Sequence, residues 1–287
     1  MSVIELTAAW YREHQRDLPW RRPEAGAWGV LVSEFMLQQT PVNRVLPMYE
    51  AWLEHWPKPG DLAAEPSGEA VRAWGRLGYP RRALRLHAAA AAITERHGGV
   101  VPAQYEELRA LPGVGDYTAA AAASFAYGRR HAVLDTNVRR VLARAYSGEQ
   151  YPAASVSAAE RTLAESLLPT EPAEAALWAA ASMELGALIC TAKSPRCDVC
   201  PVAGLCAWRK AGSPEHAGPA RKGQSYAGTD RQCRGALLAV LRAAHEPVEA
   251  DALFAAWADE EQRGRALRSL LEDGLAVRTA HNQYRLP

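Results

Sequence analysis

Four closely spaced cysteines constrain the fold of this chain more than any other sequence feature. Cys190, Cys197, Cys200 and Cys206 follow the pattern C-x6-C-x2-C-x5-C. Thiolates this close together can surround one metal centre, either tetrahedral zinc or an iron–sulfur cluster. Zinc sites more often pair two short knuckles, and this segment has one. Four unrelated free thiols are the alternative, which the spacing disfavours. Cys233 lies outside the group and is expected to be a bystander.

A helical pattern fills the chain before residue 212. Alanine is abundant and β-branched residues are sparse there, which favours helix. Thr40 is expected to cap the helix that Pro41 opens. The apolar spacing predicts helices over 3–16, 30–37, 41–56, 68–76, 80–97, 103–110, 116–127, 136–145, 155–168 and 173–190. The fold class is therefore predicted to be mainly α.

The end of the chain has a different organisation. Residues 211–228 have the composition of a linker. Three short helical patterns follow, and then two alternating runs around a turn. They cover residues 231–244, 248–257 and 260–273 for the helices, and 275–279 and 283–286 for the strands. This order predicts a small winged-helix-like module.

Composition excludes several classes of protein. Hydrophobic residues make up 48% of the 287 residues, which is enough for a sizeable core and excludes general disorder. Lys+Arg is 33 and Asp+Glu is 32, so the chain is not a polycation, although local basic patches remain possible. No apolar run approaches the ~20 residues of a membrane span, and the N-terminus has no signal-peptide pattern. We expect a cytoplasmic, reducing location, where disulfides are rare.

The segment from Leu111 to Tyr117, Leu-Pro-Gly-Val-Gly-Asp-Tyr, joins two predicted helices. Gly113 and Gly115 permit positive φ and close backbone approach. The second helix would begin at Asp116 or Tyr117, and its free N–H groups could hold an anion such as a phosphate. The alternative is an ordinary turn between two helices.

Two carboxylates are candidate chemical groups. Asp135 precedes a predicted helix, so its simplest role is that of an N-cap. Glu34 is flanked by Val32, Phe35, Met36 and Leu37, which is unusual for a glutamate in a cytosolic helix. Its simplest role is that of a buried ion-pair partner.

Together these motifs resemble the endonuclease III and MutY family of DNA glycosylases. The resemblance covers residues 3–212 and rests on the cysteine loop, the Leu-Pro-Gly-Val-Gly hairpin, Ser-Glu-Phe-Met-Leu-Gln-Gln-Thr at 33–40 and Leu-Asp-Thr-Asn-Val at 134–138. It implies a 4Fe–4S cluster on the four cysteines and a two-lobed helix-hairpin-helix glycosylase fold. The expected lobes are 1–26 with 132–212, and 27–131. A linker at 213–228 and the winged-helix-like module at 229–287 would follow.

The resemblance also implies catalytic roles. Glu34 would be the general acid that protonates the departing adenine, because an apolar setting favours the protonated form of a carboxylic acid. Asp135 would stabilise positive charge on the sugar, and Asn137 would orient Asp135 or the water. Tyr117 would help to position both acids. It stands where bifunctional relatives have an amine, so the enzyme is expected to be monofunctional.

The target base must be flipped out of the duplex to reach these groups. By resemblance, Gln39 and Thr40 enter the helix, and Tyr79 is the wedge beside the opposite 8-oxoguanine. Two further sets are implied: Leu18, Trp20 and Arg21 near the adenine pocket, and Leu111, Gly113, Val114 and Gly115 on phosphate. Apart from the resemblance, clustered arginines are candidates to line one DNA groove, and a solvated surface is the alternative for any one of them. They stand at 72, 76, 81, 82, 85, 129, 130, 139, 140 and 144. A packed aromatic in a turn is the alternative for Tyr79.

The chain departs from the family pattern at three places. Pro80 replaces a second tyrosine, which should alter the local turn. Ala179 and Ala180 stand where the family often has amide or acid side chains, and Ala180 cannot hydrogen-bond to adenine through its side chain. The tail is also too short and too helical for the Nudix-like domain that reads 8-oxoguanine in many MutY proteins.

The resulting hypothesis is a monofunctional, monomeric glycosylase in base excision repair. It would act on double-stranded DNA with adenine opposite 8-oxoguanine or guanine, in a bacterial-type cytoplasm and with no membrane partner. One alternative is a mismatch thymine/uracil glycosylase of the same superfamily. The other is a non-catalytic iron–sulfur DNA-binding regulator, which would not need Glu34 and Asp135 together.

Overall fold

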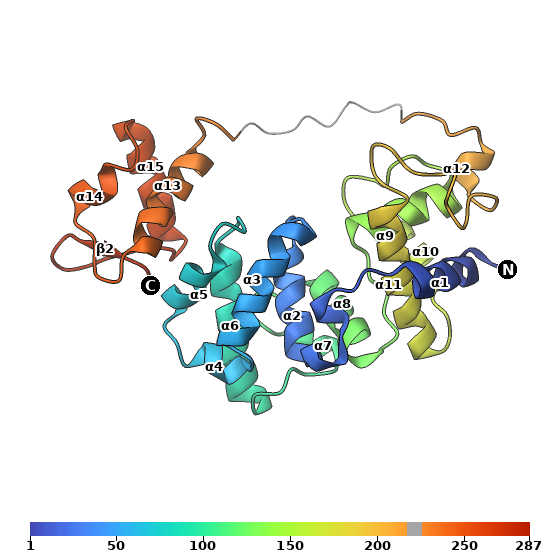
Figure 1. Cartoon of the computed structure of the whole chain (residues 1–287), viewed down its shortest axis with the longest axis horizontal. Helices are drawn as coiled ribbons and strands as arrows, with labels where there is room; N and C mark the ends of the chain where they lie inside the picture. Colours follow the sequence, from blue (N-terminus) through green and yellow to red (C-terminus); the bar gives the residue numbers. More distant parts are fainter. Residues whose placement is uncertain (217–225) are drawn as a thin grey trace. The chain divides into compact units, whose positions relative to one another are not determined.

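A computed structural model describes residues 1–216 and 226–287 and is built of helices (Figure 1). The helices are α1 Val3–His14, α2 Gly26–Leu37, α3 Val42–His55, α4 Pro59–Ala63, α5 Ser67–Trp74, α6 Arg81–His97, α7 Tyr105–Arg109, α8 Asp116–Tyr127, α9 Thr136–Leu142, α10 Ala158–Ser166, α11 Pro172–Leu188, α12 Ala207–Lys210, α13 Asp230–Ala243, α14 Ala250–Phe254 and α15 Glu260–Glu272. Short helical turns are η1 Pro19–Arg21, η2 Pro23–Ala25 and η3 Ala143–Ser147, the last of which is π-helical. The predicted mainly-α class is confirmed.

Contacts group the chain into two compact units. One unit contains Met1–Leu31, Ala103–Ala110 and Val114–Ala220, and the other contains Val32–Pro102, Leu111–Gly113 and Arg221–Pro287. These units divide the chain at different residues from the lobes expected from the sequence. The hairpin helix α8 belongs with the cysteine loop, and the described part of the C-terminal segment belongs with α3 to α6. The expected lobe division stays a prediction.

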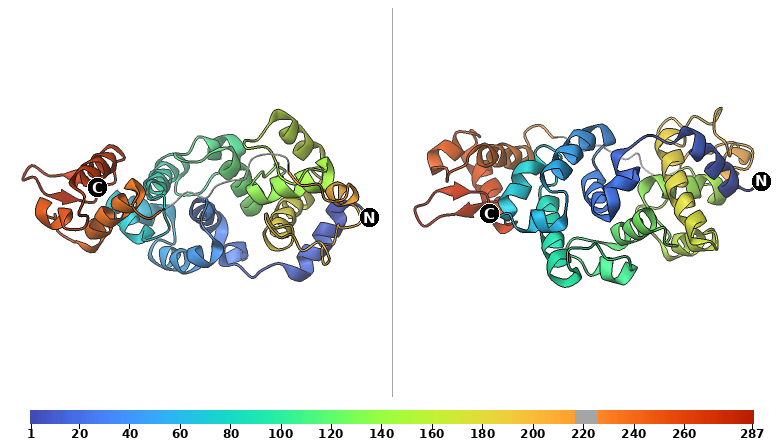
Figure 2. Two further views of the ribbon diagram at one scale, coloured as in Figure 1. Left: turned by 90° about the horizontal axis from the view of Figure 1, so that it is seen from above. Right: turned by 60° about the horizontal axis from the view of Figure 1, so that its bottom comes forward.

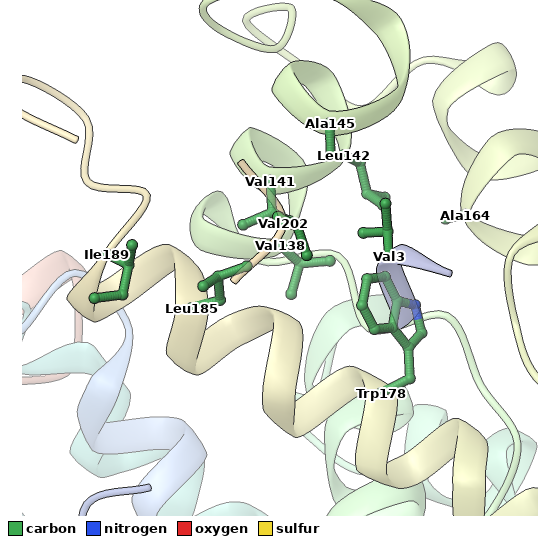
Figure 3. Packing of buried hydrophobic residues seen from close by; sticks show 10 residues of the cluster. All are labelled: Val3, Val138, Val141, Leu142, Ala145, Ala164, Trp178, Leu185, Ile189 and Val202. Carbon is green, nitrogen blue, oxygen red and sulfur yellow. The ribbon is translucent and has the colours of Figure 1, made fainter. Parts of the chain in front are cut away.

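The core of the first unit forms where α9 packs on α11. Val138 and Val141 of α9 lie over Leu185 and Trp178 of α11, and all four are buried (Figure 3). Helix α1 adds Val3 to this cluster. Its start is fixed by a capping box, in which the Ser2 hydroxyl accepts from the Glu5 N–H and the Glu5 carboxylate accepts from the Ser2 N–H. This core is the platform that carries Asp135 and the cysteine loop.

The core of the second unit contains stacked tryptophans. Trp52 of α3 lies edge-on to Trp56, with ring centroids 4.6 Å apart, and edge-on to Trp74 of α5 at 5.7 Å. Leu86 and Ile93 of α6 are fully buried in the same unit. Edge-to-face aromatic pairs contribute about 0.5–1.5 kcal/mol beyond their burial. The packing fixes α5 and α6, between which Tyr79 lies.

The C-terminal module, defined as residues 229–287, has the predicted three helices followed by a hairpin. Strands β1 Val277–Arg278 and β2 Tyr284–Arg285 pair antiparallel and form a two-stranded sheet (Figure 2). Both are shorter than predicted. An isolated bridge joins Val248 to Tyr284. Leu237, Leu241, Leu253, Leu270 and Tyr284 are buried and form the module's core.

Several local predictions need correction. The N-cap of α3 is Pro41, without a side-chain cap bond, so Thr40 does not cap this helix. The Thr40 hydroxyl instead donates to the Leu77 carbonyl at 3.2 Å. Helix α2 begins at Gly26, before the predicted start. Helices α4 and α12, of five and four residues, were not predicted. Of the predicted linker, 217–225 lies outside the described residues. No helix in the described ranges is both long and apolar enough to span a membrane.

Candidate active site

Asp135 is held as a fixed acceptor at the start of α9. Its Oδ1 accepts from the backbone N–H groups of Asn137 at 2.9 Å and Val138 at 2.6 Å. Its Oδ2 accepts from Asn137 Nδ2 at 2.7 Å. Burial raises the pKa of the Asp135 carboxyl, and these three hydrogen bonds act against that rise. The N-cap role is therefore observed, and it leaves a preorganised carboxylate that is partly buried.

Two residues behind Asn137 complete this support: Arg140, which the sequence had assigned to a DNA groove, and Gly186. Arg140 Nη2 donates to Asn137 Oδ1 at 2.8 Å and to the Gly186 carbonyl at 2.5 Å, and its Nε donates to the Cys190 carbonyl at 2.6 Å. A Cβ on Gly186 would lie 2.7 Å from Asn137 Cβ, so only glycine lets α11 approach so closely. Arg140 thus links the Asp135–Asn137 pair to the cysteine loop. The neighbouring sequence gave no signal of this, because its partners lie in a distant segment.

The hairpin between α7 and α8 uses its two glycines differently. Gly113 has φ +76°, and a Cβ there would lie 2.6 Å from Arg85 Cβ, so glycine is required. Gly115 has φ −96°, so it does not use the positive φ that glycine permits. Gly115 is the N-cap of α8, and the space where its Cβ would stand is open. That opening permits the close approach of a phosphate to the helix start. Leu111 and Val114 are buried and anchor the turn.

Tyr117 is partly buried in the first turn of α8. It packs against a small cluster that includes Ala120, Val133 and Ala179. Since Val133 is two residues from Asp135 in the chain, the shared cluster ties the hairpin helix to the strand-like segment that carries the carboxylate. The position carries a phenol and no amine, as the sequence indicated.

Glu34 lies in the buried part of α2, in the other unit. It is 4% exposed, and Ser33, Phe35 and Met36 beside it are fully buried. The apolar surroundings expected from the sequence are therefore present. Helix α2 ends at Leu37 and leads directly into the turn that carries Gln39 and Thr40.

Arg82, the second residue of α6, fastens this turn to the Tyr79 turn. Its guanidinium donates to the carbonyls of Phe35, Met36 and Gln38 at 2.8, 3.0 and 2.6 Å. It also donates to the Gly78 carbonyl and to Thr40 Oγ1, both at 3.0 Å. Burial lowers the pKa of Arg82 to about 10, so the group stays charged at neutral pH.

Gln39 and Tyr79 both adopt the left-handed backbone region. Their φ angles are +56° and +48°, values that few non-glycine residues adopt. Such conformations cost about 1–3 kcal/mol each and persist where surrounding contacts hold them. Tyr79 is 51% exposed, and Arg82 Cζ lies 5.4 Å from its ring centroid. Both positions belong to the set predicted to enter DNA, and Ser213 and Asn282 also have positive φ among the described residues.

The Leu-Pro-Trp-Arg segment is packed into its unit. Leu18 and Trp20 are 5% and 8% exposed. Arg21 donates to both oxygens of Glu184, at 3.1 and 2.8 Å, and Arg16 forms a second bidentate pair with the same carboxylate. Burial alone would raise the pKa of Glu184, but the two arginines lower it to about 2. Glu184 is therefore a charged anchor for the segment, and contact of Leu18, Trp20 and Arg21 with adenine stays a prediction.

Five of the arginines predicted to line a DNA groove are buried or half-buried, and their guanidinium groups are bound within the protein. Arg139 pairs with Glu160 at 2.6 Å, and Arg144 donates to the carbonyls of Thr191 and Ala192. Arg82, Arg139, Arg140 and Arg144 are buried, and Arg72 is bound to backbone carbonyls. The groove prediction was wrong for these five, because a run of arginines does not reveal acceptors in distant segments. Exposed members of the set are Arg76, Arg81, Arg85, Arg129 and Arg130.

The four cysteines line one cavity. It is partly open to solvent and lies against Val141, Leu185 and Ile189 of the α9–α11 core. Four cysteines on one cavity are a ligand set for an iron–sulfur cluster or for tetrahedral zinc.

The surroundings of the cysteines suit thiolate ligands. Arg144 Nη1 lies 3.4 Å from Cys190 Sγ, and Arg209 donates to the Cys197 carbonyl at 2.7 Å. Burial raises the pKa of Cys190 and raises that of Cys200 to about 11. Such thiols become thiolates when a positive centre lies among them, as iron would supply. Cys233 is buried in the C-terminal module and takes no part.

Comparison with known proteins places this site in a class. Residues 32–167 match the HhH-GPD superfamily of base excision DNA repair proteins, and residues 190–206 match the iron–sulfur binding domain of endonuclease III. The fold is similar to a thermostable thymine-DNA glycosylase, with TM-score 0.64 and 27% identity over 72% of this chain and 95% of that one. It is also similar to endonuclease III in a non-covalent DNA complex, with TM-score 0.61 and 25% identity over 72% and 94%. The chain is a helix-hairpin-helix DNA repair glycosylase with an iron–sulfur domain.

A comparison at higher sequence identity shows the family within this class. The chain is 51% identical to the adenine DNA glycosylase of Mycobacterium tuberculosis over 280 residues, which cover 97% of this chain and 91% of that protein. The chain belongs to the adenine DNA glycosylase family. The resemblance and the 4Fe–4S assignment drawn from the sequence are thereby confirmed. The individual site roles, the monomeric state and the cytoplasmic location stay predictions.

Proposed function

We propose that this enzyme is a monofunctional adenine DNA glycosylase that flips adenine out of mispairs with 8-oxoguanine or guanine and hydrolyses its glycosidic bond. The observation that carries the proposal is the fixed carboxylate of Asp135, held by Asn137 and Val138 beside a hairpin helix that presents Tyr117 instead of an amine. Without an amine at that position the sugar is attacked by water, and the strand is not cleaved.

The chemistry divides between the two acids. As the glycosidic bond breaks, its electron pair moves to the adenine and positive charge develops on the sugar. Glu34 donates a proton to a ring nitrogen of the leaving base. Asp135, preorganised by Asn137, stabilises the sugar cation electrostatically or by transient covalent capture. Water then adds to the anomeric carbon and loses a proton, which leaves an abasic site and free adenine.

Recognition of the mispair falls to the turns held by Arg82. Gln39 and Tyr79 are strained, and Tyr79 exposes half of its ring, as a wedge that enters a base stack would require. The small C-terminal module does not resemble a Nudix-like domain. We therefore assign contact with the opposite base to Gln39, Thr40 and Tyr79.

The nearest alternative is a thymine or uracil mismatch glycosylase. Ala180 favours it, because this side chain cannot hydrogen-bond to adenine. The 27% identity to a thymine-DNA glycosylase against 51% to an adenine DNA glycosylase favours adenine. A non-catalytic regulator would not need Glu34 and Asp135 together, and the 51% identity to an adenine DNA glycosylase favours the enzyme.

The test is a panel of duplexes with A:8-oxoguanine, A:G, G:T and G:U mispairs. Adenine should be released fastest, and the strand should break only after alkali. Asp135→Asn should bind the same duplexes and release almost no base. Preferential release of thymine or uracil would overturn the substrate assignment.

A further inference from the structure

The C-terminal module is bonded to the two helices that flank the Tyr79 turn. Helix α5 ends at Trp74 and α6 begins at Arg81, so Tyr79 lies in the short connection between them. The module and both helices belong to the same compact unit.

Arg72 of α5 and Arg242 of α13 each donate hydrogen bonds to backbone carbonyls of the other's segment. Arg72 Nη1 donates to the Ala244 carbonyl at 2.8 Å and to the Arg242 carbonyl. Arg242 Nε donates in return to the Val71 carbonyl at 2.9 Å. Each guanidinium thus satisfies backbone carbonyls of the other segment, which fixes the direction as well as the distance of the contact.

At the start of α5, the backbones themselves touch. The Gly68 N–H donates to the Pro287 carbonyl at 2.9 Å. A Cβ on Gly68 would lie 2.3 Å from that oxygen and 3.0 Å from Leu286 Cβ. Position 68 must therefore be glycine for the module to sit where it does.

On α6, the contact reaches the residue after the Tyr79 turn. Arg81 Nη1 pairs with Asp273 Oδ1 at 3.2 Å, and Asp273 Oδ2 pairs with Arg234 of α13 at 2.6 Å. The module is thus bonded to the chain on both sides of Tyr79.

The charge of the module argues against DNA reading by its third helix. In helix-turn-helix proteins the N-terminal residues of this helix contact the bases. Here Asp259 caps α15 and Glu260 and Glu261 form its first turn, so negative charge stands where base contacts would be made, and the arginines of α15 begin only at Arg263.

We propose that the C-terminal module is a positioning element for the Tyr79 wedge. By bonding to α5 and to Arg81, it holds both ends of the connection that carries the left-handed Tyr79 backbone, in addition to the bonds that Trp74 and Arg82 make to the Gly78 carbonyl within it. The module thus takes part in mispair recognition without touching the opposite base. The inference rests on the wedge role proposed above for Tyr79.

The test measures wedge insertion directly in the full-length protein. In one strand of the duplex, the target adenine carries a 2′-fluoro sugar that prevents hydrolysis. In the other strand, 2-aminopurine stands beside the base opposite this adenine. The fluorescence of 2-aminopurine rises when an inserted side chain unstacks it from its neighbour. Gly68→Ala and Arg72→Ala should abolish most of the rise seen with the unmodified protein. With ordinary adenine they should slow base release about tenfold, as expected for the loss of a buried anchoring bond.

Three further variants make the result decisive. Arg72→Lys keeps a donor for the carbonyls and should recover part of the signal. Arg265→Ala removes an exposed arginine that pairs only with Asp230 and Glu261 inside the module, and it should behave like the unmodified protein. Tyr79→Ala sets the signal of a missing wedge.

The outcomes separate the two proposals. If Tyr79→Ala leaves the fluorescence rise intact, the wedge role and the positioning role both fail. If Tyr79→Ala abolishes the rise while Gly68→Ala and Arg72→Ala keep it, the positioning role fails and the proposed function stands. Circular dichroism establishes that each variant has the helix content of the parent. Should Gly68→Ala not fold, the Arg72→Ala and Arg72→Lys pair decides the matter.

Discussion

At the residue scale, the Asp135 carboxylate, to which we assign stabilisation of the sugar cation, depends on Asn137 more than on any charge. Asn137→Ala removes the 2.7 Å bond to Asp135 Oδ2 and leaves the backbone donors in place. A hydrogen bond to a charged group contributes about 1.5–3 kcal/mol, so single-turnover adenine release should fall roughly 10- to 100-fold. Binding of the mispaired duplex should stay the same. Thr136→Ala, an exposed neighbour, is the control. Equal rates for both variants would remove Asn137 from the mechanism.

The same bond sets a pH dependence. Asp135 works as an anion, so activity is lost as pH falls through its pKa, which burial raises above the ordinary value. A hydrogen bond to the carboxylate lowers the pKa, and its removal in Asn137→Ala raises the pKa further. The acid limb of the single-turnover rate against pH should therefore move to higher pH in Asn137→Ala and stay in place in Thr136→Ala. A limb that moves to lower pH would contradict the assignment of Asp135.

At the element scale, the two turns predicted to enter DNA are held by one buried arginine at the start of α6. Arg82→Lys replaces a planar donor set that reaches five oxygens with a compact ammonium that cannot reach them together. The free energy of unfolding should fall by about 2–4 kcal/mol, measured by denaturant titration, and binding of the mispaired duplex should weaken. Arg96→Lys changes an exposed arginine of the same helix and should change neither. If Arg82→Lys leaves the free energy of unfolding unchanged, the turns that carry Gln39 and Tyr79 do not depend on the Arg82 hydrogen bonds.

Helices and the hairpin could be predicted from the sequence because their signals lie in neighbouring residues. Contacts between side chains of distant segments could not. Apolar spacing located α8 at its observed bounds and the three helices and hairpin of the module. The cysteine spacing predicted a metal centre, and the sequence motifs around Glu34 and Asp135 indicated the two candidate acids. The sequence could not show that Arg139 meets Glu160 or that Arg140 meets Cys190, because those acceptors come from other elements. The sequence also could not show which of the two hairpin glycines adopts positive φ, because glycine permits that conformation without requiring it.

At the scale of the whole molecule, the cluster loop and the catalytic carboxylate share one support. Arg140 bonds both Cys190 and Asn137, so disorder in the loop reaches Asp135 through a single side chain. Cys200→Ser should reduce the broad visible absorption of the iron–sulfur protein. It should also slow adenine release about tenfold or more in the folded fraction, because a misplaced supporting residue costs on the order of 1–2 kcal/mol. Cys233→Ser, buried in the C-terminal module, should keep both the absorption and the rate. A Cys200→Ser protein that is colourless, folded and fully active would show that the loop and the carboxylate are independent, and that the bond through Arg140 transmits nothing to the reaction.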